Sequence, residues 1–60
     1  MITVFSLDGV KHTIRKEAID RVESAVQGTE AITRIWLRGA LFSIDCTVPH
    51  DDVVSMIKTA

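Results

Sequence analysis

The sequence has few of the residues that cross-link or ligate in small proteins. Its 60 residues include one cysteine, Cys46, and one proline, Pro49. A single cysteine excludes an internal disulfide, and no group of cysteine and histidine has the spacing of a zinc site. A lone cysteine is also typical of a reducing compartment, so we expect a cytoplasmic protein. Because no ligand cluster is present, we expect no metal or other cofactor.

Long runs of like-charged or of apolar residues are absent as well. The net charge is -1, and no block of like charge indicates a nucleic-acid tail or a membrane-surface helix. No apolar run approaches the ~20 residues that a membrane span requires. Residues 1–5 lack the basic region and cleavage site of a signal peptide. We therefore expect no membrane partner and no binding of long nucleic acid.

What the sequence does have is a large apolar fraction in a short chain. Hydrophobic residues make up 47% of it, and its length allows one small domain, residues 1–60. A chain this short buries only roughly 60% of the surface that its unfolded form exposes. Part of the apolar surface therefore has no core to enter, and we expect the chain to form a homo-oligomer.

The first fifteen residues have the pattern of a β-hairpin. Residues 2–7 are rich in β-branched and aromatic types, and residues 10–15 alternate apolar and polar side chains. Between them, Asp8-Gly9 tolerates positive φ and closes tight hairpins. The sequence predicts strands over 2–7 and 10–15.

Residues 16–27 allow two interpretations. Ala18, Val22 and Ala25 recur at helical spacing, and Gly28 is suited to ending a helix. The same segment also alternates in the manner of an amphipathic strand. Periodicity alone slightly favours the helix.

The second half predicts another hairpin. Residues 32–38 and 40–48 both alternate apolar and polar side chains, with Gly39 between them as the turn.

The last residues predict a short helix. Pro49 cannot continue a strand ladder and suits a first helical turn. Acidic residues follow it and Lys58 comes near the end, which complements the helix dipole at both termini. One apolar face, expected to pack on the sheet, is formed by Val53, Met56 and Ile57.

These elements give a β-rich α+β fold. We expect a small antiparallel sheet, made of two hairpins plus a short connecting strand or helix, with a C-terminal helix. With this order of elements, the sequence resembles the small flagellar FlbD-type (SwrD-like) proteins and related small phage and bacterial proteins. The matching stretches are residues 2–9, 18–23, 33–39 and 51–57.

The resemblance implies a non-enzymatic accessory protein and supplies no catalytic residues. It also implies a short strand from Ile19 to Glu23 after a single turn, which reverses the preference for a helix there. The sequence departs from the family pattern in its extra residues around 27–31 and in lacking a strongly basic tail.

The titratable residues favour structural roles. Cys46 lies on the apolar face of its predicted strand, where a small buried hydrophobe is expected rather than a nucleophile. His12 is interpreted as a half-buried strand residue rather than a metal ligand. His50, with Asp51 and Asp52, is more typical of a helix start than of a metal site. No glycine-rich phosphate loop is present, so we expect no self-sufficient enzyme.

One group stands apart. Arg34, Trp36 and Arg38 share one strand face, opposite Ile35 and Leu37. Trp36 then has three interpretations. It belongs to the core with the arginine stems beside it, it anchors a protein interface, or it stacks a base while the arginines hold phosphates.

The sequence therefore predicts a non-enzymatic, self-associating binding module that engages a protein partner. Its predicted binding surface is Arg34, Trp36 and Arg38. Two alternatives stay open: a binder of nucleic acid or a small nucleotide signal through the same face, and a regulatory subunit that is active only with a partner.

Overall fold

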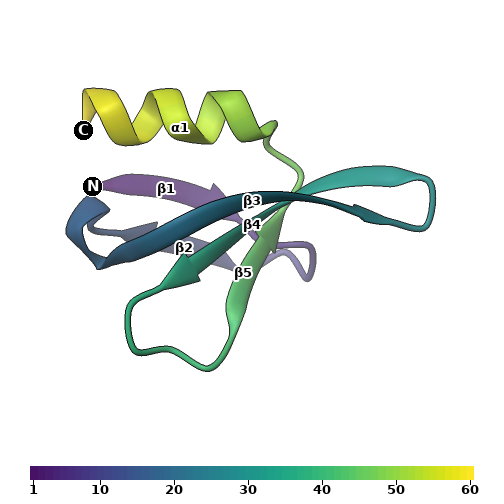
Figure 1. Ribbon diagram of the computed structural model, residues 1–60, viewed down its shortest axis with the longest axis horizontal. Coiled ribbons are helices and arrows are strands. Elements are labelled where there is room, and N and C mark those ends of the chain that lie inside the picture. Colours follow the sequence, from purple (N-terminus) through teal and green to yellow (C-terminus); the bar gives the residue numbers. More distant parts are fainter.

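The computed structural model describes residues 1–60 and contains two antiparallel sheets and one helix (Figure 1). One sheet has the order β1-β2 and the other β3-β4-β5. This is the predicted β-rich α+β fold. The elements are β1 Ile2–Phe5, β2 Lys11–Ile14, a 3-10 turn Lys16–Ala18, β3 Ile19–Gln27, β4 Glu30–Leu37, β5 Ser43–Cys46 and α1 His50–Thr59.

The two sheets meet where β1 ends and β5 ends. Ser6 bridges to Cys46, and the Leu7 amide donates to the Asp45 carbonyl at 3.0 Å. Figure 1 shows β1 and β2 behind the three-stranded sheet, with α1 along one side and both chain termini at the same end. The inner face of the three-stranded sheet is therefore the covered one.

The core lies between the two sheets and the helix. On β4, Ile35 has no exposed surface, and on α1 the same is true of Val53. Met56 and Ile57 pack against the cluster from the next turns of α1, which confirms the predicted apolar face. The buried cluster is Ile2, Val4, Ile14, Ile19, Ile35, Cys46 and Val53.

No helix in this structure is long and apolar enough to cross a membrane.

The first hairpin is confirmed, with shorter strands than predicted: β1 ends at Phe5 rather than residue 7, and β2 spans Lys11–Ile14 rather than 10–15. Strands β1 and β2 pair from Ile2 opposite Ile14 to Phe5 opposite Lys11. The connection turns at Gly9, whose φ of 85° is in the left-handed region that glycine reaches without a Cβ penalty.

Residues 16–27 do not form a helix. After a single 3-10 turn they form β3, which pairs with β4 from Ile19 to Gln27. The pairing ends in the two-residue turn Gly28-Thr29, where Gly28 has a φ of 65°. A ladder of eight residue pairs with the neighbouring strand outweighs the weak helical spacing. The expected strand from Ile19 to Glu23 is present but is not short: it continues to Gln27, and β4 begins at Glu30 directly after the turn.

The second hairpin has different bounds from those predicted. Residues 40–42 lie outside any strand, and the side chains of Leu41 and Phe42 are 87% and 80% exposed. The chain leaves the ladder after Leu37, whose carbonyl accepts from the Ala40 amide at 3.2 Å, and pairing resumes at Ser43. The predicted strand was too long because apolar and polar residues continue to alternate through the turn that joins β4 to β5.

Strand β5 also ends earlier than predicted, at Cys46 rather than residue 48. The buried hydroxyl of Thr33 donates to the Val48 carbonyl. A side chain thus satisfies a backbone acceptor that a longer ladder would have paired, and the chain is free to turn toward α1.

We expect Ile35→Ala to unfold most of the population. Such a truncation in a core costs about 2–5 kcal/mol, whereas a core of this size rarely supplies more than ~3–5 kcal/mol. Ile35→Val should cost roughly 0.5–1.5 kcal/mol. Urea unfolding followed by circular dichroism measures both, with Val26→Ala as the control because Val26 is 74% exposed. Equal stability of Ile35→Ala and the control would contradict the assigned core.

Candidate functional site

The candidate site is the face of the three-stranded sheet that points away from the core, called the outer face below. Successive side chains of a strand point to opposite faces. Because Ile35 points into the core, Arg34 and Trp36 point outward. Registered neighbours on β3 and β5 lie on the same face, and its polar part with Trp36 comprises Arg21, Glu23, Arg34, Trp36, Ser43 and Asp45.

The first row across this face places Trp36 between Arg21 on β3 and Ser43 on β5. The Cζ atom of Arg21 lies 4.9 Å from the centroid of the Trp36 ring, which is a cation–π contact. Trp36 is half-buried, and its Nε1 atom is buried without a hydrogen-bond partner. The ring therefore lies outside the core, against its own sheet and under a guanidinium group.

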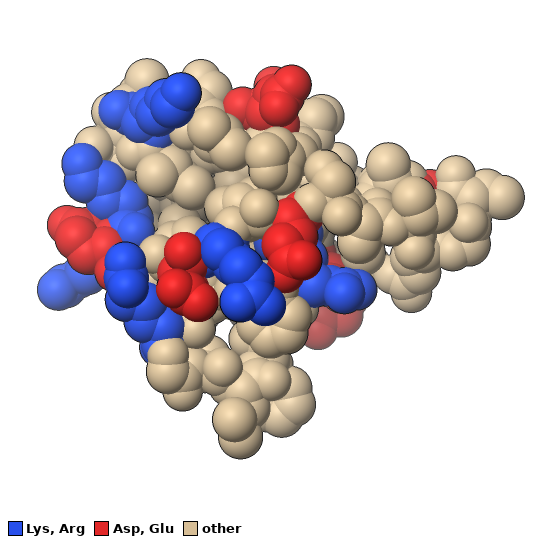
Figure 2. Space-filling view, in the orientation of Figure 1, with Lys and Arg blue, Asp and Glu red and all other residues tan.

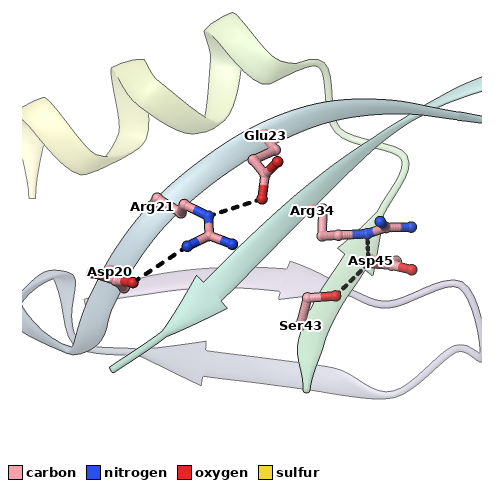
Figure 3. A network of polar contacts seen from close by, with 6 residues as sticks. All are labelled: Asp20, Arg21, Glu23, Arg34, Ser43 and Asp45. Atoms are coloured by element: carbon pink, nitrogen blue, oxygen red, sulfur yellow. Dashed lines mark hydrogen bonds and ion pairs between the residues drawn. The ribbon is translucent and has the colours of Figure 1, made fainter. Parts of the chain in front are cut away.

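The second row places Arg34 between Glu23 on β3 and Asp45 on β5. The Nε atom of Arg34 donates to Oδ1 of Asp45 at 3.1 Å, and the Ser43 hydroxyl donates to the same oxygen at 3.0 Å. Figure 3 shows this group pointing to one side of the sheet. The guanidinium of Arg34 is thus held in place on the strand.

Arg21 joins the two rows. Its Nε atom donates to Oε1 of Glu23 at 2.9 Å, and its Nη1 atom lies 3.9 Å from Oδ2 of Asp20 (Figure 3). Pairs this exposed contribute about 0–1 kcal/mol each. Their effect is to orient the Arg21 side chain over Trp36 rather than to stabilise the fold.

The pKa of Glu23 is lowered from its ordinary value of 4.5, first by the hydrogen bond from Arg21. The Trp36 indole N–H is near enough to lower it further, but Nε1 does not reach hydrogen-bond geometry. A free indole donor therefore lies beside a carboxylate that is already engaged by Arg21.

Charge on the molecule is mixed. Figure 2 shows basic and acidic side chains gathered in one band across the outer face, with neither sign dominating. The projecting β3–β4 hairpin at the right and the loop between β4 and β5 below are almost free of charged groups. The band is typical of a surface that recognises a shaped, mixed-charge partner rather than a polyanion.

The structure separates Arg38 from the other two predicted site residues. Arg38 follows the end of β4, where its amide donates to the Ala18 carbonyl at 2.9 Å. Its Nε atom donates to the Glu17 carbonyl at 3.0 Å. Arg38 therefore holds the 3-10 turn, whereas Arg34 and Trp36 lie together on the outer face.

Sequence reasoning missed Arg21, Glu23 and Asp45. Their place in the site depends on which residues of neighbouring strands lie opposite each other. The sequence of one strand alone does not show this register. The available signal was the alternation of residues 19–27, since a strand there puts Arg21 and Glu23 on one face.

A second polar cluster lies at the turn of the first hairpin. The Ser6 hydroxyl bonds to Oδ1 of Asp8 and lies 3.3 Å from Nε2 of His12, beside a groove of about 350 Å³. In a nucleophilic triad the histidine lies between the serine and the acid. Here the serine lies between them, and Asp8 also accepts from the Val10 amide, so the cluster closes the turn.

Cys46 is fully buried, and burial raises the pKa of its thiol. A thiol that is inaccessible and protonated is a poor nucleophile. No group of three His, Cys, Asp or Glu side chains lies close enough to hold a metal ion. His12 and His50 are half-buried, and His50 contacts Asp51 at the start of α1 at 3.4 Å.

A scan against protein-family models, a search of curated protein sequences and a search of solved structures found no match to this chain.

We expect Arg21→Gln to raise the pKa of Glu23 toward 4.5, because the largest cause that lowers it is the Arg21 hydrogen bond. A lowered folded-state pKa adds stability above the unfolded pKa, and that stability is lost as pH falls through the folded value. The variant should therefore lose less stability on acidification. Carboxyl carbon NMR titration measures the pKa, with Lys11→Gln as the control. An unchanged Glu23 titration in Arg21→Gln would contradict the pairing.

Proposed function

We propose that the protein is a non-enzymatic accessory module that associates with itself and binds a protein partner through the outer face. The observation that carries this proposal is the position of Trp36. The ring lies on the face turned away from the core, flanked by Arg21 and beside Arg34. Tryptophan and arginine are the residue types most enriched among the dominant residues of protein interfaces.

The order within the site supports a protein partner further. Arg34 is fixed by Asp45, so little side-chain freedom is lost when a partner packs on it.

Exposed apolar side chains at the border of the face support contact with protein as well. Phe42 directly precedes Ser43, the end of the first row, and is 80% exposed beside the 87% exposed Leu41. Large apolar groups of this kind, next to an ordered polar surface, are typical of binding sites. The resemblance to FlbD-type proteins is in line with an accessory role.

A small nucleotide as ligand has weaker support. Arg21 already covers a face of the Trp36 ring, on which a base would stack. Arg34 faces Asp45, which offsets the charge that would attract a phosphate. Binding a nucleotide would require both arginines to leave their present partners.

The test is photocrosslinking in the source cells with benzoyl-phenylalanine in place of Phe42. We expect a discrete adduct heavier than a dimer of the chain, and its loss when Trp36→Ala or Arg34→Glu is added. The same group in place of Phe5, which is 59% exposed on the other sheet, is the matched control and should give no such adduct. An adduct that persists in Trp36→Ala, or equal adducts from both positions, would overturn the outer face as the partner site.

A further inference from the structure

Strand β3 has nine residues and pairs with β4 on one side only. In an antiparallel ladder, successive residues turn their backbone groups alternately toward and away from the neighbour. Counted from the two-residue turn closed by Gln27 and Glu30, the residues facing away from β4 are Val22, Ser24 and Val26. No backbone hydrogen bond outside the ladders reaches them, so their amides and carbonyls have no partner in the protomer. Helix α1 contacts β3 through its core-facing residues Val53, Met56 and Ile57 and does not hydrogen-bond to this edge.

We propose that this edge pairs antiparallel with the same edge of a second copy, with the two-fold axis at Val22. The inference rests on the self-association in the proposed function and names the contact that produces it. A two-fold contact requires a surface that is complementary to itself. The residues of the β3 edge meet this condition in one register.

In that register Val22 lies opposite Val22 of the second copy. Moving outward from the axis, Arg21 lies opposite Glu23, and this pair occurs twice; the irregularity between Ile19 and Arg21 ends the regular register beyond it. Opposite charges directly across two strands stabilise the pairing. Each guanidinium then lies between its own Glu23, at 2.9 Å, and the Glu23 across the axis.

The neighbouring registers lack this complementarity. An axis at Glu23 puts the two Glu23 carboxylates directly opposite each other, which is destabilising. An axis at Ser24 puts Arg21 opposite Gln27 and Glu23 opposite Ala25, so neither charge gains a partner. Charge therefore selects the axis at Val22 among the registers that keep the inner faces together.

The pairing has a consequence for the outer face. A two-fold axis perpendicular to the sheet joins two three-stranded sheets into one of six strands, with both outer faces on the same side. The two copies of Trp36 then flank the shared β3 strands, each one strand away from the axis. The dimer presents its partner with a doubled surface, so binding to a dimeric partner gains from effective concentration.

The test is light scattering of the purified chain over a range of concentrations. We expect a dimer for the wild type, and dimer dissociation constants raised about tenfold or more for R21E and for E23R, because each change puts like charges opposite each other. Mixing R21E with E23R should restore the dimer, since every charged position then faces its opposite. This rescue should weaken in high salt.

Two kinds of control accompany the charge variants. Lys11→Glu and Glu30→Arg make the same charge changes on strands outside the proposed contact, and mixing them should change nothing. Ser24→Pro removes an outward amide that β4 does not use, so the chain should fold by circular dichroism yet remain monomeric. This variant keeps the test decisive if a charge variant fails to fold.

The outcomes separate the proposals. A wild type that stays monomeric at millimolar concentration overturns both the self-association and the β3 contact, while the photocrosslinking result for the outer face stands on its own. A wild-type dimer that persists in Ser24→Pro, or that Lys11→Glu weakens as much as R21E does, overturns the β3 edge alone. A mixture of R21E and E23R without heterodimer overturns the register.

Discussion

The burial of Ile35 is the constraint on which the rest of the structure depends. With no exposed surface, this side chain fixes which face of β4 meets the first hairpin and the helix. Its neighbours Arg34 and Trp36 must then face the other way, because side chains alternate along a strand. The same alternation, carried across the ladder by register, brings Arg21 and Asp45 to the outer face. The candidate site is thus a consequence of how the core is filled.

The outer face has basic and acidic side chains in nearly equal number. Each arginine on it has a carboxylate within 3.1 Å, so the face has little excess of either sign. Such a surface gains little from polyanions but discriminates well between shaped partners, because misplaced charges are penalised. The same neutrality lets Arg21 and Glu23 act in two places. On the face, Glu23 holds Arg21 over Trp36, and at the edge of β3 the two residues form a charge pattern complementary to itself.

The sequence predicted most elements, but not their neighbours. Alternation over residues 33–37 showed which side chains of β4 share a face, but not which of the two faces is buried. Only the packed core decides that Trp36 lies outside. Helical spacing at Ala18, Val22 and Ala25 was misleading, since the long ladder to β4 overrides a weak local preference. Gly39 was correctly placed in a turn, yet alternation alone could not show that Phe42 lies outside the strand. Arg21 was missed because register is a property of two strands.

The orientation of Trp36 in the single protomer is the claim to test most directly. Nuclear Overhauser contacts of the indole ring in a dilute, isotopically labelled sample report its neighbours without reference to any partner. We expect contacts from the ring to the Arg21 side chain and to the Ser43 β-protons. Contacts from the ring to Val4 and Val53, both fully buried in the core, would contradict the account.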